Sequence, residues 1–178
     1  MSSSEVPDSK HLLFAYGSLM LTTGIEAVDA AMHAAGASLG RAFIHARLYD
    51  LGEYPGAVPL QQDEDVEGPA EGYQADERHR ALAHEDAPKV WGRLIRLRDP
   101  EAFYAVIDAY EGFDPAKPME SEFIRAETVV FLEHEDKGIV SQVYFYNHPI
   151  HGRHPIEAGD YLAFWHAKGR PAQGRIVP

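Results

Sequence analysis

The 178-residue chain has no cysteine and few basic residues, and both shortages limit what it can do. The absence of cysteine excludes disulfides, thiolate metal sites and cysteine nucleophiles, and it fits a cytoplasmic protein. Lys and Arg total 16 against 28 Asp and Glu, which gives a formal charge of −12. Because nucleic-acid binders present a basic stripe, we expect no nucleic-acid partner. Catalysis, if present, must use oxygen or nitrogen groups.

Long apolar runs are also missing. No stretch reaches 18 apolar residues and residues 1–10 are polar, so we expect no contact with a membrane and no secretory signal. We expect residues 1–10 to form a flexible N-terminus. With 45% apolar residues the chain can bury one substantial core, and we predict a single domain over residues 1–178.

Residues 61–89 are rich in charge and poor in large apolar side chains. Such a segment buries little surface, so we interpret it as an acidic loop insertion, with a short helix over residues 78–84. A solvated loop and a mobile lid over a site both fit this composition.

The rest of the chain shows strand and helix patterns. Thr23 and Glu26 have the spacing of a capping box before a helix that Gly36 ends. Asp99 and Pro100 begin a second helix, and Gly112 closes it. Strands are predicted over residues 12–16, 42–51, 57–60, 90–97, 124–132 and 139–146, the last two joined as a hairpin. Strands and helices that do not alternate strictly predict an α+β domain built round a curled sheet or a small barrel.

Two segments suggest chemistry. After the first strand, Tyr16-Gly17-Ser18-Leu19 can turn successive backbone N–H groups inward, with Gly17 allowing close approach to a ligand; a plain tight turn is the alternative. No Gly-x-Ser-x-Gly elbow surrounds Ser18, so we do not expect it to be a nucleophile. Glu111 ends the second helix, where the helix dipole should raise its pKa; a solvated surface residue is the alternative.

These segments carry a family resemblance. Residues 14–19, Phe-Ala-Tyr-Gly-Ser-Leu, resemble the Tyr-Gly-Ser/Thr-Leu signature of the gamma-glutamylcyclotransferase-like superfamily, which includes gamma-glutamylamine cyclotransferases and plant avirulence-induced proteins. Further matching segments follow in that family's order, namely residues 47–52, 54–56, 90–92, 108–112, 123–125 and 143–146. The resemblance covers roughly residues 12–148. It implies an α+β fold with a small mixed β-barrel and flanking helices.

The resemblance also implies an activity. A gamma-glutamyl compound forms 5-oxoproline when its α-amine attacks its own γ-carbonyl, and this needs neither a metal nor another cofactor. Glu111 would be the acid and base, and Tyr16, Gly17, Ser18 and Leu19 would bind the substrate. A domain that binds a small molecule or a protein without catalysis, and hydrolysis of another amide, are the alternatives.

Other residues carry weaker expectations. Tyr54, Pro55 and Gly56 line the pocket wall by analogy with the family, or form a plain turn. Arg125 and Tyr146 lie on strands from which they could face the substrate, the core or the surface.

The C-terminal part of the chain lies outside the resemblance. Its histidines, His148, His151 and His154, match no standard zinc spacing, so we predict no metal site. We expect residues 149–178 to form a tail packed on the core, with a homodimer contact as the alternative.

Overall fold

The computed structural model describes residues 8–60 and 87–169. Most of the acidic insertion lies outside these ranges, including the short helix expected over residues 78–84. Among the described residues, no helix is long and apolar enough to cross a membrane.

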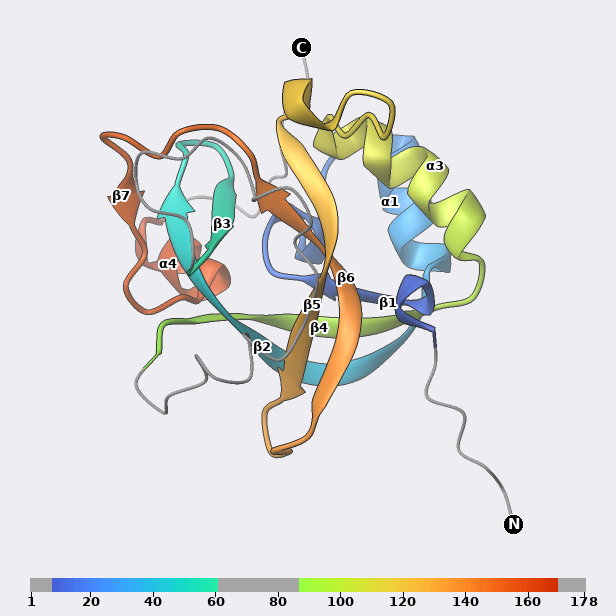
Figure 1. The fold of residues 1–178 in the computed structure, drawn as a ribbon, viewed down its shortest axis with the longest axis horizontal. Coiled ribbons are helices and arrows are strands. Elements are labelled where there is room, and N and C mark those ends of the chain that lie inside the picture. The colour runs from blue at the N-terminus through green and yellow to red at the C-terminus, as the bar shows by residue number, and fades with distance from the viewer. Residues whose placement is uncertain (1–7, 61–86, 170–178) are drawn as a thin grey trace.

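A closed five-stranded barrel forms the centre of the molecule (Figure 1). The chain of hydrogen-bonded strands runs β2-β4-β1-β6-β5 and returns to β2 through the pairing of Phe43 with Phe131. The β1 and β6 strands are parallel and the other barrel pairs are antiparallel, so the barrel is mixed, as predicted. The barrel strands are β1 (Leu12–Ala15), β2 (Gly36–Asp50), β4 (Lys89–Leu97), β5 (Phe123–Leu132) and β6 (Gly138–Tyr146).

Short elements extend the barrel. The second half of β2 leaves the barrel to pair with β3 (Pro55–Pro59) and β7 (His154–Pro155). The predicted turn at Tyr54-Pro55-Gly56 is therefore wrong in part, because Pro55 and Gly56 already pair with Asp50 and Tyr49. Three 3-10 turns complete these elements: η1 (Ser9–His11), η2 (Ser18–Met20) and η3 (Pro118–Glu120).

Alternating side chains fill the barrel. Ile44, Ala46 and Leu48 of β2 point into the same cluster as Phe14 and Phe145, as the alternation in the sequence predicts. Helix α4 (Tyr161–Ala167) adds the buried Tyr161 and Trp165 to this cluster. The described part of the C-terminal segment thus packs against the barrel core.

Two helices cover an outer face of the barrel (Figure 1). They are α1 (Glu26–Ala34) and α3 (Pro100–Glu111), and their apolar side chains form a second cluster with β1 and β6. The capping box predicted for Thr23 and Glu26 is wrong: the helix begins later, and the hydroxyl and N–H of Thr23 both bond the Asp29 carboxylate at 2.7 Å. A side-chain acceptor inside the helix has taken the place of the expected cap.

Trp165→Ala tests how far α4 depends on packing against the barrel. Truncating a buried aromatic side chain leaves a cavity, so we expect the free energy of unfolding to fall by about 3–5 kcal/mol in urea titrations. His166→Ala, one residue further along the same helix, removes an exposed side chain and should change stability by less than about 0.5 kcal/mol. Similar losses for the two variants would contradict this packing role.

Candidate active site

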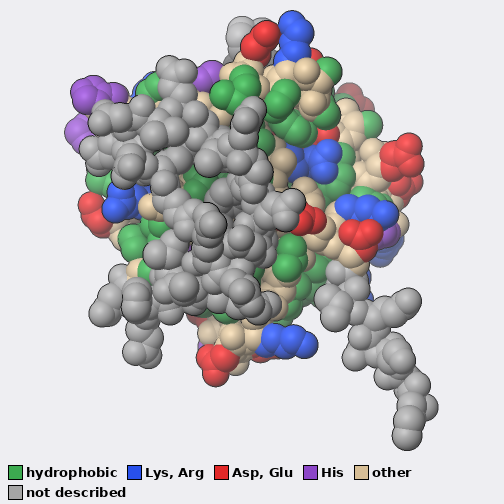
Figure 2. Space-filling model, in the orientation of Figure 1, with side chains coloured by type: hydrophobic (Ala, Val, Ile, Leu, Met, Phe, Trp, Pro, Cys, Tyr) green, Lys and Arg blue, Asp and Glu red, His purple; other side chains and the backbone are tan. Residues whose placement is uncertain are grey.

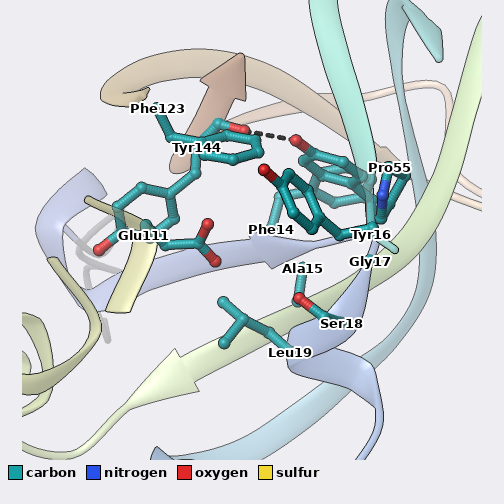
Figure 3. Close-up of a pocket in the computed structure, with 11 residues that line it drawn as sticks. Phe14, Ala15, Tyr16, Gly17, Ser18, Leu19, Pro55, Glu111, Phe123 and Tyr144 are labelled. Carbon is teal, nitrogen blue, oxygen red and sulfur yellow. Dashed lines mark hydrogen bonds between the residues drawn. The ribbon is translucent and has the colours of Figure 1, made fainter. Parts of the chain in front are cut away.

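A narrow cleft opens where β1 ends, between the barrel and the C-terminal end of α3 (Figure 3). The empty space between its walls, counted together with the part open to solvent, is about 390 Å³. The lining residues come from β1 and the turn after it, the start of β3, the end of α3, and β5 and β6: Phe14, Ala15, Tyr16, Gly17, Ser18, Leu19, Tyr54, Pro55, Glu111, Phe123 and Tyr144.

Helix α3 delivers Glu111 to this cleft. Asp99 caps the start of the helix by accepting the N–H of Ala102 at 3.0 Å, as predicted. Gly112 ends it with a left-handed backbone, φ 68°, which glycine adopts without strain. Glu111 is therefore the last helical residue, the residue is 8% exposed, and its carboxylate projects into the cleft (Figure 3).

Tyr16 anchors the opposite wall. Its hydroxyl donates to the carbonyl of Tyr144 at 2.7 Å and accepts the N–H of Ala57 at 3.1 Å. Burial raises the pKa of Tyr16, and the nearby charge of Glu111 raises it further. The hydroxyl thus stays protonated and is engaged by the protein backbone, while the ring lines the cleft.

The chain turns sharply after Tyr16. Ser18 to Met20 form the 3-10 turn η2, so the N–H groups of Ser18 and Leu19 have no acceptor within that turn. A Cβ on Gly17 would lie 2.7 Å from Cγ of Pro55, so only glycine allows the turn to approach β3 this closely. The hydroxyl of Tyr110 donates to Oγ of Ser18 at 3.2 Å, which ties the turn to α3.

Phe14, Ala15, Phe123 and Tyr144 also line the cleft, although none of them was predicted as a site residue from the sequence. Tyr144 is the most informative of the four. It shares a face of β6 with Tyr146, so strand alternation could have suggested either residue. Its hydroxyl donates to Oδ1 of Asp108 at 2.6 Å, and burial followed by this hydrogen bond raises its pKa.

Three predicted site residues lie outside the lining of the cleft. Arg125 pairs with Asp108 and borders a separate groove on the barrel surface. Gly56 packs against Tyr146, because a Cβ on Gly56 would lie 2.8 Å from the Cβ of that tyrosine. The Tyr146 ring in turn contacts Phe123, so Gly56 and Tyr146 support the cleft wall from behind.

Within residues 8–60 and 87–169, no group of three or more His, Asp or Glu side chains is arranged to hold a metal ion. His148, His151 and His154 are exposed on the segment before α4. Figure 2 shows histidine side chains on the surface at the edge of the molecule where β7 lies in Figure 1. The cleft instead places one buried carboxylate and the turn at residues 17–19 between aromatic walls. Such a site can bind an anionic or carbonyl oxygen on one side and exchange a proton on the other.

Comparison with known proteins relates this cleft to a family. The family model described as "Gamma-glutamyl cyclotransferase, AIG2-like" matches residues 70–163. The matched region includes Glu111 and Tyr144 but begins after the Tyr16 turn. No curated protein matches the chain significantly.

Several solved structures share the fold. Protein ytfP from Escherichia coli is 24% identical with a TM-score of 0.51, the match covering 85% of this chain and 96% of that one. PH0828 from Pyrococcus horikoshii is 15% identical with a TM-score of 0.51, the match covering 90% and 98%. YkqA from Bacillus subtilis, at 17% identity and a TM-score of 0.51, is longer: the match covers 90% of this chain but 43% of that one. At these identities the likeness shows the barrel fold alone.

Gly17→Ala tests the close contact that shapes the turn. The added methyl group would lie 2.7 Å from Cγ of Pro55, so the turn or β3 must shift. We expect a loss of about 1–3 kcal/mol in unfolding free energy, as for other overpacked sites. Pro55→Ala removes the clashing atom, so the double variant should lose less than the sum of the two single variants. Additive losses in urea unfolding would show that this contact does not constrain the turn.

Proposed function

Because the chain belongs to the family of AIG2-like gamma-glutamyl cyclotransferases, we propose that it releases 5-oxoproline from a gamma-glutamyl amide or amine. The α-amine of the substrate attacks its own γ-carbonyl carbon, a new C–N bond closes the five-membered ring, and the original amide C–N bond breaks. Both reacting groups belong to one molecule, so the enzyme mainly has to fold the substrate and move protons. The proposal requires no cofactor.

Glu111 is the proposed acid and base, and its position is the observation that carries the proposal. The residue is buried, and its carboxylate lies in the cleft at the end of a helix that is capped at both ends. It accepts a proton from the α-ammonium group as the amine attacks and returns a proton to the departing amine. The proton count on the protein is unchanged at the end of the cycle.

The turn after Tyr16 is the proposed oxygen cradle. The N–H groups of Ser18 and Leu19 at the start of η2 bind the substrate carboxylate, or the γ-carbonyl oxygen as negative charge develops on it. In Figure 3 this turn lies across the cleft from Glu111. Substrate held between them would have its reacting groups next to the carboxylate.

The tyrosines of the cleft have a passive role in this proposal. The pKa values of Tyr16 and Tyr144 are raised, in each case mainly by burial, so both phenols remain neutral at working pH. Neutral phenols do not compete with Glu111 as bases. They form apolar walls of the cleft against which a folded substrate can pack.

Release of 5-oxoproline from gamma-glutamyl amino acids, gamma-glutamyl amines and glutathione tests this function. We expect turnover of at least one substrate by the native protein. In Glu111→Gln we expect kcat to fall by about 10²- to 10⁴-fold, the usual contribution of a general acid and base, while calorimetry still detects substrate binding.

Glu120→Gln is the matched control, because Glu120 is an exposed glutamate on η3 that pairs with Lys117. It should keep native kcat. Full activity in Glu111→Gln would remove Glu111 from the mechanism. No release from any substrate by the native protein would favour a binding domain or an enzyme for another amide.

A further inference from the structure

Asp108 and Arg125 form a salt bridge just outside the cleft. The guanidinium of Arg125 on β5 reaches both carboxylate oxygens of Asp108 on α3, at 2.9 Å from Nε to Oδ1 and 3.1 Å from Nη2 to Oδ2. It also lies 4.1 Å from the ring centroid of Tyr104, one turn earlier on the same helix. Two hydrogen bonds and a stacked ring fix the direction of the guanidinium and, with it, the Asp108 carboxylate.

Asp108 also connects this contact to the cleft. Its Oδ1 accepts the hydroxyl of Tyr144 at 2.6 Å, while the Tyr144 ring lines the cleft. Figure 3 shows that ring beside the Glu111 side chain, with its hydroxyl directed away from the Glu111 carboxylate. Tyr144 thereby directs its O–H to Asp108.

Helix geometry places two of the carboxylates of α3, Asp108 and Glu111, in one row. Residues three apart lie on the same side of a helix, so Asp108 and Glu111 both face the barrel, one turn apart. A contact that holds Asp108 against β5 and β6 therefore also fixes the helix end that carries Glu111. It sets how far that end reaches toward the cleft and how it is rotated about the helix axis.

We infer that Asp108, held by Arg125, is a positioning residue that fixes the Tyr144 ring beside Glu111 and locks the end of α3 against the barrel. This inference rests on the proposed function only for its kinetic consequences. The two opposite charges also cancel each other close to Glu111, so removing either one alone leaves a net charge beside the cleft. The charge of Glu111 acts on the phenols of Tyr16 and Tyr144, and Tyr54 lines the same cleft. Asp108 and Tyr110 lie on the same helix as Glu111, Glu122 lies beside Gly112, and Arg125 pairs with Asp108.

Kinetics of Asp108→Asn and Arg125→Met test the positioning role. A small misplacement of the reacting groups lowers the rate more than it lowers affinity, so we expect kcat to fall about 10- to 100-fold with KM changed by less than about threefold. Tyr144→Phe keeps the ring and both charges but loses the hydroxyl bond, so it should show a smaller fall in kcat. Thermal unfolding identifies any variant that fails to fold.

A second measurement does not depend on activity. The Glu111 carboxyl can be titrated by its ¹³C chemical shift in the native protein and in each variant. Asp108→Asn leaves the positive charge of Arg125, so the midpoint should move down, whereas Arg125→Met leaves the negative charge of Asp108 and should move it up. Each shift should be on the order of half a pH unit, and the double variant should return close to the native midpoint.

Arg41→Met is the matched control, because Arg41 pairs with Glu133 and Asp160 and does not line the cleft. It should leave both kcat and the Glu111 midpoint unchanged. Native kcat and an unmoved midpoint in folded Asp108→Asn and Arg125→Met would overturn this inference while leaving the proposed function intact. If the native protein releases no 5-oxoproline, the proposed function fails, and the titration still decides whether Asp108 and Arg125 act on Glu111.

Discussion

The hydroxyl of Tyr16 holds together three segments that build the cleft. It receives the Ala57 N–H from β3 and donates to the Tyr144 carbonyl on β6, at the point where its own strand, β1, ends. Without such a partner, two buried backbone groups would be unsatisfied, which is costly in a core. Because burial raises the pKa of this phenol, its proton remains available for the bond at every working pH. The position of the turn at residues 17–19 follows from this anchor.

The same anchor places the cleft at the end of β1. Alternating apolar side chains of the described barrel strands, joined by Tyr161 and Trp165 of α4, pack into one buried cluster. The cleft lies where β1 stops and the chain turns away, with α3 as the facing wall. Close packing of Gly17 on Pro55 keeps this space narrow.

Local rules predicted much of this arrangement. The Asp99 cap, the Gly112 terminator and the inward residues of β2 follow from short-range preferences that tertiary contacts reinforce. Long-range pairing decided the rest. Pro55 and Gly56 belong to a strand because β2 provides a pairing partner. Thr23 bonds the Asp29 carboxylate and does not form the expected capping box. In the register of β5 against β6, Arg125 lies opposite Tyr144, which lines the cleft, but its guanidinium is held by Asp108 of α3 outside the cleft lining. No single-strand pattern contains that register.

The row of carboxylates on α3 shows how one helix can serve two purposes. Asp108 and Glu111 are one turn apart, yet their surroundings differ: Asp108 accepts hydrogen bonds from a guanidinium and a phenol, and Glu111 projects into the cleft. The Asp108 carboxylate is engaged by these two partners and does not line the cleft. A carboxylate that faces a ligand space can gain and lose a proton as the ligand does. The salt bridge between Asp108 and Arg125 thus fixes α3 against the barrel, while Glu111 is the carboxylate of this row that faces the cleft.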